Sequence, residues 1–254
     1  MSPLVMVRSR RRGFSPLSTG KLRLWLHGGA RTWQDAAMTV PAALDGDVVG
    51  GWADGSGLVN DATQATTAAK PVLRVGALNG KNVLEFDGAD DHLIRTNTAS
   101  LEATDMTLMV VANVVDRPIE RVLAARYYGG GAPRWRLFVR EITYPLSAAL
   151  GMQYSNAFTR DAAPALDSWH TFTGEYKSDV GAAYIRLDYV DPSYVVVAEG
   201  AANQRALYVG ATLDGPVPSL FHKGYIAEIC YFVPSLTDAE RIQMLDYFTA
   251  GWGL

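Results

Sequence analysis

The chain of 254 residues is long enough to bury a large core, and hydrophobic residues make up 48% of it against 19% charged residues. It contains no apolar run of about 18 residues, which excludes a membrane-spanning helix, and we expect a soluble protein without an export signal. The net charge is only −3, and the single cysteine, Cys230, excludes an intrachain disulfide and any multi-cysteine metal site.

The chain begins with a basic arm, predicted to span residues 1–20. Seven of the 23 basic residues precede the first acidic residue, Asp35, so the rest of the chain holds 16 basic and 26 acidic residues, a net charge of −10. This asymmetry predicts a partner for the arm, most economically a neighbouring subunit in an assembly. The predicted partner-binding residues are Arg8, Arg10, Arg11 and Arg12. A solvated tail is the alternative, and nucleic acid is disfavoured because the acidic body would repel a polyanion.

The body of the chain, residues 21–254, shows the alternation of apolar and polar residues that is typical of strands. In the segment 21–26, three leucines share one face and Trp25 takes the other. The nearly continuous apolar run 106–115 predicts a strand covered on both faces. Further strands are predicted at 83–87, 121–126, 134–141, 169–177, 183–189, 194–198, 206–210 and 224–232. Turn residues between them favour two packed antiparallel sheets in one domain.

Two turn motifs lie in the first half of the chain. In Trp52-Ala-Asp-Gly-Ser-Gly57, glycines permit positive φ, the aspartate and serine bond nearby backbone amides, and the tryptophan anchors the turn to the core. In Phe86-Asp-Gly-Ala-Asp-Asp91, we expect Phe86 to pack inward while Asp87 and Asp90 tie down the turn. The alternative is that these carboxylates bind Ca²⁺, which takes 6 to 8 oxygen ligands. Because no EF-hand register is present, no metal ligand is assigned.

The strand 134–141 carries the most distinctive surface pattern. Period-2 geometry places Arg134, Arg136, Phe138 and Arg140 on one face, which predicts a cationic stripe. With Tyr127 and Tyr128 in the preceding loop, this face is a candidate site for an acidic polysaccharide, because guanidinium groups pair with carboxylates and aromatic rings stack on sugars. The alternative is an ordinary solvated sheet face balanced by acidic neighbours. The candidate glycan-binding residues are Tyr127, Tyr128, Arg134, Arg136 and Arg140.

A helix is predicted at the end of the chain. Thr237-Asp-Ala-Glu240 matches a capping box, and apolar residues recur at helical spacing at Ile242, Leu245, Phe248 and Trp252. We expect this helix to lie against the sandwich and to end at Gly251 and Gly253. Trp252 and Leu254 are then expected to fill an apolar pocket.

Two blocks carry a family resemblance: Trp52 to Leu93, with the turn motifs above, and the closing G-Y-I-A-E-I-C-Y-F-V-P-S-L-T-D-A-E-R with its terminal W-G-L. Together they resemble the concanavalin A-like lectin/glucanase superfamily, in the laminin-G-like jelly-roll branch common in bacterial and bacteriophage proteins. The resemblance implies an all-β fold, an antiparallel β-sandwich with one C-terminal helix, over residues 21–254. That superfamily holds lectins, hydrolases and structural modules, so the fold does not fix the chemistry.

Catalytic patterns are absent from the sequence. Retaining hydrolases of the superfamily carry an E-x-D-x-E or E-x-D-x-x-E strand, and no such string occurs here. Glu175 and Asp188 are the best candidates for an acid pair formed between strands. The serine at 56 lacks the full G-x-S-x-G elbow. The four histidines, His27, His92, His170 and His222, are isolated from metal or catalytic spacings. We therefore expect no catalytic residue and no enzymatic activity.

The sequence as a whole favours a structural component of a bacteriophage virion, either a capsid decoration protein or a tail or fibre protein attached through its arm. Its partners would be other virion proteins or copies of itself, with no membrane and no cofactor apart from the calcium alternative. A carbohydrate-binding module that recognises a host surface glycan is the alternative function, and a glycoside hydrolase is the third.

Overall fold

The structure is a computed structural model of the chain. It describes residues 13–28, 30–118, 120–126, 135–143, 146–154, 157–162, 164–190, 193–196 and 205–254. The predicted arm residues Arg8, Arg10, Arg11 and Arg12 lie outside these ranges, so the boundary at residue 20 and the role of the arm stay predictions. None of the helices in the described part is long and apolar enough to cross a membrane.

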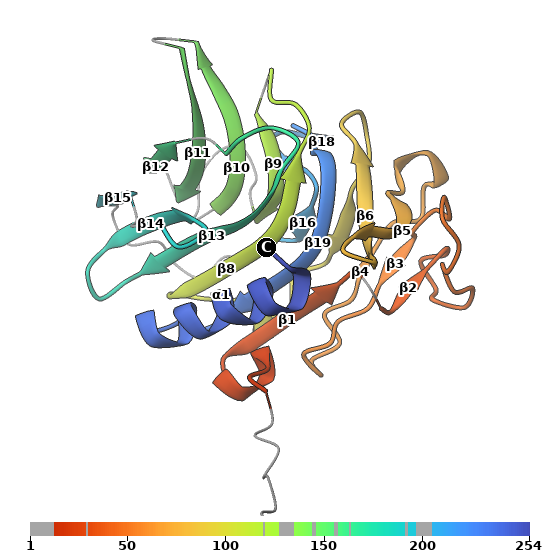
Figure 1. Ribbon diagram of the computed structural model, residues 1–254, viewed down its shortest axis with the longest axis horizontal. Helices are drawn as coiled ribbons and strands as arrows, with labels where there is room; N and C mark the ends of the chain where they lie inside the picture. Colours follow the sequence, from red (N-terminus) through yellow and green to blue (C-terminus); the bar gives the residue numbers. More distant parts are fainter. Residues whose placement is uncertain are drawn as a thin grey trace, which may run out of the picture.

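Two large antiparallel sheets form the body of the protein (Figure 1). Sheet A has the order β15-β14-β13-β8-β19-β6-β5, and β1 also pairs with β19. Its strands are β1 (Leu22–His27), β5 (Val72–Leu78), β6 (Lys81–Asp87), β8 (Met106–Val114), β13 (Trp169–Lys177), β14 (Ala182–Leu187), β15 (Ser193–Val196) and β19 (Lys223–Phe232).

Sheet B has the order β12-β11-β10-β9-β16-β7-β4-β3-β2. Its strands are β2 (Thr32–Trp33), β3 (Gly51–Trp52), β4 (Ala62–Thr63), β7 (Leu93–Arg95), β9 (Arg121–Arg126), β10 (Trp135–Thr143), β11 (Leu146–Tyr154), β12 (Ala157–Ala162) and β16 (Leu207–Val209). A small hairpin joins β17 (Thr212–Leu213) to β18 (Pro218–Ser219), and three short 3-10 helices cover Pro16–Thr19, Thr67–Ala69 and Ala99–Leu101.

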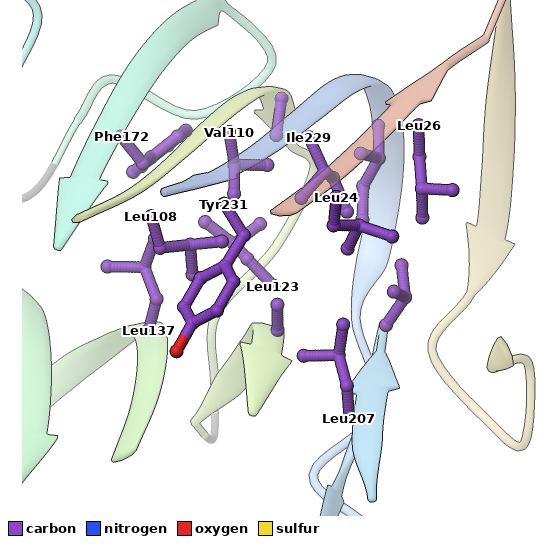
Figure 2. Packing of buried hydrophobic residues seen from close by; sticks show 14 of the residues in the cluster. Leu24, Leu26, Leu108, Val110, Leu123, Leu137, Phe172, Leu207, Ile229 and Tyr231 are labelled. Atoms are coloured by element: carbon purple, nitrogen blue, oxygen red, sulfur yellow. The ribbon is translucent and has the colours of Figure 1, made fainter. Parts of the chain in front are cut away.

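The main core lies between the two sheets (Figure 2). Leu108 and Val110 of sheet A meet Leu123, Leu137 and Leu207 of sheet B in one buried cluster. Each such side chain contributes roughly 2 kcal/mol when it leaves water. The predicted all-β sandwich is therefore confirmed, and the continuous apolar run 106–115 is explained because every residue of β8 is buried.

The second core lies between sheet A and the helix α1 (Asp238–Trp252), which crosses the outer face of that sheet. The capping box is confirmed, with the Thr237 side chain accepting from the Glu240 amide and the Glu240 side chain accepting from the Thr237 amide. The buried helical residues are Met244, Leu245, Phe248 and Trp252. Three details differ from prediction. Ile242 is exposed, because the covered stripe runs through Met244 instead, and Leu254, beyond the helix, is exposed as well. The helix also continues through Gly251 and is capped by Gly253.

Candidate functional site

A recess on the outer side of sheet A lies between β1, the loop that follows β3 and helix α1. Its volume is about 410 Å³, and its lining includes Trp25, His27, Ala30, Arg31, Gly55 and Tyr247. We call this site the Trp25 recess. It contains three aromatic rings and one exposed guanidinium group, so it offers both flat apolar surface and hydrogen-bond donors.

Strand β1 supplies two of the aromatic side chains because of its alternation. Its burial alternates along the strand, with the three leucines covered, so Trp25 and His27 point to the outer side of the sheet. Their ring centroids lie 6.5 Å apart in an edge arrangement. The third ring, Tyr247, comes from α1, where it also packs edge-on against Phe14 at 6.4 Å.

The loop after β3 is fastened to β1 by Asp54. Its Oδ1 accepts hydrogen bonds from the backbone amides of Trp25 and Ser56, both at 2.8 Å. The amide of Gly55 in turn donates to the Trp25 carbonyl at 2.7 Å. A Cβ at position 55 would lie 3.0 Å from the Trp25 ring, so glycine permits this close approach. The predicted scaffold role of this turn is confirmed, and Arg31 is tied to it by a 2.8 Å bond to the Asp54 carbonyl.

Beneath the recess lies a fully buried carboxylate, Glu228 of β19. Three N–H or O–H groups donate to it: Trp25 Nε1 at 2.6 Å, Trp252 Nε1 at 2.6 Å and the Tyr247 hydroxyl at 3.0 Å. The Cys230 thiol is a weaker fourth donor at 3.8 Å. His27 Nε2 lies 3.9 Å from the same group, and its ring stacks on Trp252 with centroids 4.9 Å apart. Glu228 therefore orients the aromatic walls of the recess but is not part of its lining.

Burial sets the protonation of this group of residues. It raises the pKa of Glu228 to about 6, although the three donors oppose the shift. Burial and the neighbouring Glu228 raise the pKa of Tyr247, and burial followed by the charge of Lys81 lowers the pKa of His27. Near neutral pH, Tyr247 is thus a hydroxyl donor, His27 is a neutral imidazole and Glu228 is mostly ionised. Arg31 is the positive group at the recess.

The arrangement fits a small polar ring molecule. Aromatic walls accept an apolar ring face, while the imidazole and guanidinium groups donate to hydroxyl or carbonyl oxygens. The volume lies within the range of pockets that bind small ligands. Sequence analysis missed this site because its residues come from four separate segments, and only the alternation in 21–26 indicated that Trp25 would face outward.

The predicted glycan-binding face on β10 is only partly covered by the described residues, since Tyr127, Tyr128 and Arg134 lie outside them. Arg136 Nε lies 2.9 Å from Glu120 Oε1, and Arg140 lies 3.9 Å from the other oxygen of this carboxylate. Phe138 is buried in a small outer cluster with Val122. The predicted alternation is present, but one buried carboxylate, Glu120, offsets part of the positive charge of these two arginines.

The predicted acid pair does not form. Glu175 is buried and bonds to Arg186 at 2.7 Å, whereas Asp188 accepts from the backbone amide of Thr171 at 2.7 Å. Thr171 and Glu175 are separated by four residues of β13, or roughly 13 Å of strand. The two carboxylates therefore serve different contacts.

The aspartates Asp87, Asp90 and Asp91 come together, with one carboxylate oxygen of each within 4.8 Å of the others. Asp87 Oδ1 accepts from the amide of Ala89 at 2.8 Å, and Asp91 Oδ2 accepts from the amide of Asp87 at 2.9 Å. Burial raises the pKa of Asp91 to about 7, against the backbone bond that lowers it. Asp87 thus ties down the turn as predicted, whereas the second carboxylate bonded here is that of Asp91 instead of Asp90. Calcium binding stays a prediction.

The four histidines are isolated in the sequence from metal and catalytic spacings, but in the structure His170 contacts two polar side chains. Its Nδ1 lies 2.7 Å from Asp188 Oδ2, and its Nε2 lies 2.8 Å from the hydroxyl oxygen of Ser168. A Ser-x-His pair is too common in sequences to indicate this arrangement. Asp188 joins it only through strand pairing, which is why the sequence did not reveal it.

No protein-family model and no curated protein matches the chain, whereas solved structures match its fold. A GH54 α-L-arabinofuranosidase soaked with 4-nitrophenyl α-L-arabinofuranoside has a TM-score of 0.61 at 13% identity, covering 81% of this chain and 51% of that one. Domain 4 of a GH43 extracellular arabinanase from Geobacillus stearothermophilus, in complex with arabinotriose, has a TM-score of 0.54 at 10% identity. The match covers 89% of this chain and 98% of that domain.

A Trypanosoma rangeli sialidase in complex with the inhibitor DANA has a TM-score of 0.56 at 16% identity, covering 86% of this chain and 35% of that one. The chain thus spans about half the length of the arabinofuranosidase and about a third of the sialidase. At these identities the similarity shows the fold, a β-sandwich that occurs in carbohydrate-active proteins. The finer resemblance to the laminin-G-like branch stays a prediction.

These structures contradict two expectations drawn from the sequence. The neighbours are carbohydrate-active proteins, so the main functional interpretation, a structural component of a bacteriophage virion, is wrong. The expectation of a protein without enzymatic activity is contradicted by the hydrolases among the same neighbours. That expectation depended on the absence of local motifs, and an active site assembled from different segments leaves no such motif.

Proposed function

We propose that the protein binds carbohydrate in the Trp25 recess. The observation that carries the proposal is the recess itself: half-buried aromatic rings of Trp25 and Tyr247 beside the nitrogen donors of His27 and Arg31, in a volume of about 410 Å³. Aromatic faces bind the apolar face of a sugar ring, and nearby donors bind its hydroxyl groups. This was the alternative function drawn from the sequence, now assigned to a different surface.

The neighbours support an oligosaccharide as the ligand. The arabinanase domain was solved with arabinotriose, and it shares the fold over 89% of this chain. A recess of this volume holds one or two sugar rings and leaves the rest of a chain in solvent. The proposed ligand is therefore a short oligosaccharide bound at one end or in its middle.

A calorimetric titration tests the proposal. Arabinotriose and a panel of other neutral oligosaccharides are titrated into wild type, Arg31→Ala and Arg23→Ala. Arg23 also lies on β1, but it bonds its neighbour's backbone and does not line the recess. We expect about a tenfold loss of affinity in Arg31→Ala, because one hydrogen bond to a charged group contributes about 1.5 kcal/mol, and none in Arg23→Ala.

The proposal fails if wild type binds no oligosaccharide of the panel, or if both arginine variants bind equally well. The same mixtures are assayed for new reducing ends, so that cleavage of the ligand is measured together with binding.

A further inference from the structure

A second group of side chains, outside the Trp25 recess, forms a hydrogen-bonded chain. Ser168 directly precedes β13, and His170 lies two residues further on, inside the strand. His170 Nε2 lies 2.8 Å from Ser168 Oγ, and His170 Nδ1 lies 2.7 Å from Asp188 Oδ2. The serine hydroxyl also has the Ala165 carbonyl at 2.8 Å, so the imidazole is one of two acceptors within its reach.

The aspartate is held in place by the sheet. Asp188 directly follows β14 and has a φ of 52°, in the left-handed region that aspartate tolerates better than most residues. Its Oδ1 accepts from the Thr171 amide at 2.7 Å, and its own amide donates to the Thr171 carbonyl at 2.8 Å. One carboxylate oxygen is thus fixed by backbone, and the other is left to orient His170.

The surroundings of this chain are open and apolar. The His170 side chain is 19% exposed and that of Asp188 is 39% exposed, so the group is accessible from solvent. Large apolar side chains are exposed within two residues of the serine and the aspartate: Leu166 at 43%, Tyr189 at 54% and Val190 at 56%. An apolar group bound beside these side chains would remove their apolar surface from water.

We propose that Ser168, His170 and Asp188 form a nucleophilic triad that hydrolyses a carboxylic ester with an apolar acyl group. The serine is the nucleophile, the imidazole is the general base, and the aspartate fixes the tautomer with the proton on Nδ1. The two hydrogen-bond distances match the reach required for each of these roles.

The reaction balances with water as the second substrate. Ser168 Oγ attacks the ester carbon while its proton passes to His170 Nε2. The C–O bond to the alcohol then breaks, and the alcohol leaves with that proton, which produces an acyl-serine. Water attacks the acyl carbon, gives one proton to His170, and the carboxylic acid is released as serine regains its proton.

The test uses the full chain and two 4-nitrophenyl esters, acetate and butyrate. We expect wild type to release 4-nitrophenol faster than the buffer does, with butyrate preferred. Ser168→Ala should fall to the spontaneous rate. Asp188→Asn keeps an oxygen that can accept from the Thr171 amide. Its rate of ester hydrolysis should be about a thousandfold lower than that of wild type, since asparagine does not stabilise the required tautomer of His170. A fluorophosphonate probe should label wild type at Ser168, as read by peptide mass.

Ser18→Ala is the matched control. Its hydroxyl also bonds the carbonyl three residues earlier, Ser15 at 2.5 Å, and no imidazole contact is recorded for it among the described residues. The proposal is overturned if Ser168→Ala hydrolyses the esters as fast as Ser18→Ala does, if wild type does not exceed the spontaneous rate, or if the probe labels another residue. Because these esters contain no sugar, the outcome is independent of binding in the Trp25 recess.

Discussion

Trp252 donates its indole hydrogen to the buried carboxylate of Glu228 over 2.6 Å, which joins the last turn of α1 to β19. Trp25 and Tyr247 donate to the same carboxylate from β1 and from the middle of the helix. Each donor offsets part of the free-energy cost of burying the charge. Removing one donor destabilises the folded protein, because the charge stays buried and the cost stays the same. Two predictions follow from these contacts, a third from two glycines, and a fourth from the start of the helix.

Tyr247→Phe removes one donor to Glu228 and keeps the ring. We expect the free energy of unfolding to fall by about 1.5 kcal/mol, the contribution of a hydrogen bond to a charged group. Urea denaturation followed by circular dichroism measures this change. Tyr189→Phe is the control, since its hydroxyl bonds Asp246 at the surface and its loss should change stability by about 0.5 kcal/mol or less. Equal effects of the two variants would show that Glu228 does not depend on Tyr247.

Glu228→Gln should alter the pH dependence of stability. The pKa of Glu228 is raised from 4.5 to about 6 in the folded protein, so between these values the folded state keeps a proton that the unfolded state has released. The free energy of unfolding of wild type therefore falls by about 2 kcal/mol as pH rises through this window. Glutamine does not titrate in this window. The free energy of unfolding of the variant minus that of wild type should therefore rise by about 2 kcal/mol as pH rises from 4.5 to about 6. Parallel curves for the two proteins would contradict the raised pKa.

Gly55→Ala and Gly251→Ala should act in opposite directions. A Cβ at position 55 meets the Trp25 ring at 3.0 Å, so we expect a loss of about 1 kcal/mol and a shift in tryptophan fluorescence. A Cβ at position 251 meets nothing within 4 Å and lies in the helix, so Gly251→Ala should raise the free energy of unfolding by about 0.5 to 1 kcal/mol. Thermal denaturation of both variants shows whether the melting temperature falls for Gly55→Ala and rises for Gly251→Ala. A neutral Gly55→Ala would mean that the loop can move away from Trp25.

Thr237→Ala should destabilise the start of α1. Its hydroxyl accepts from the Glu240 amide, and losing this cap costs about 1 kcal/mol. Thr237→Ser keeps the hydroxyl and should remain within a few tenths of wild type. The helical signal at 222 nm is recorded during urea denaturation of both. If serine were as damaging as alanine, the methyl group rather than the cap would be responsible.

The fold was largely predictable from the sequence because its periodicity is strong. The alternation in β1, the apolar run of β8 and the capping box at Thr237 each matched the structure. Cys230 is buried among the apolar residues of its strand, and burial raises the pKa of its thiol well above the ordinary value. The strands β5, β11 and β12 and several two-residue strands were missed; 146–162, for example, is rich in alanine and lacks a clear alternation.

The candidate sites were not predictable because no local pattern encodes them. Trp25, Arg31 and Tyr247 meet only after β1, the loop following β3 and α1 have packed together. Asp188 reaches His170 through the pairing of β13 with β14. Glu228 shows the limit most clearly: its sequence neighbours are those of an ordinary buried strand, and its three donors come from residues 25, 247 and 252.

Strand β1 has a consequence for how the protein is made. In the described part of the chain its one strand partner is β19, and α1 then covers the pair (Figure 1). During synthesis, β1 leaves the ribosome about 200 residues before the strand that pairs with its backbone. A nascent chain stopped before residue 223 would therefore expose the unpaired backbone N–H and C=O groups of β1 to chaperones and to other copies of itself.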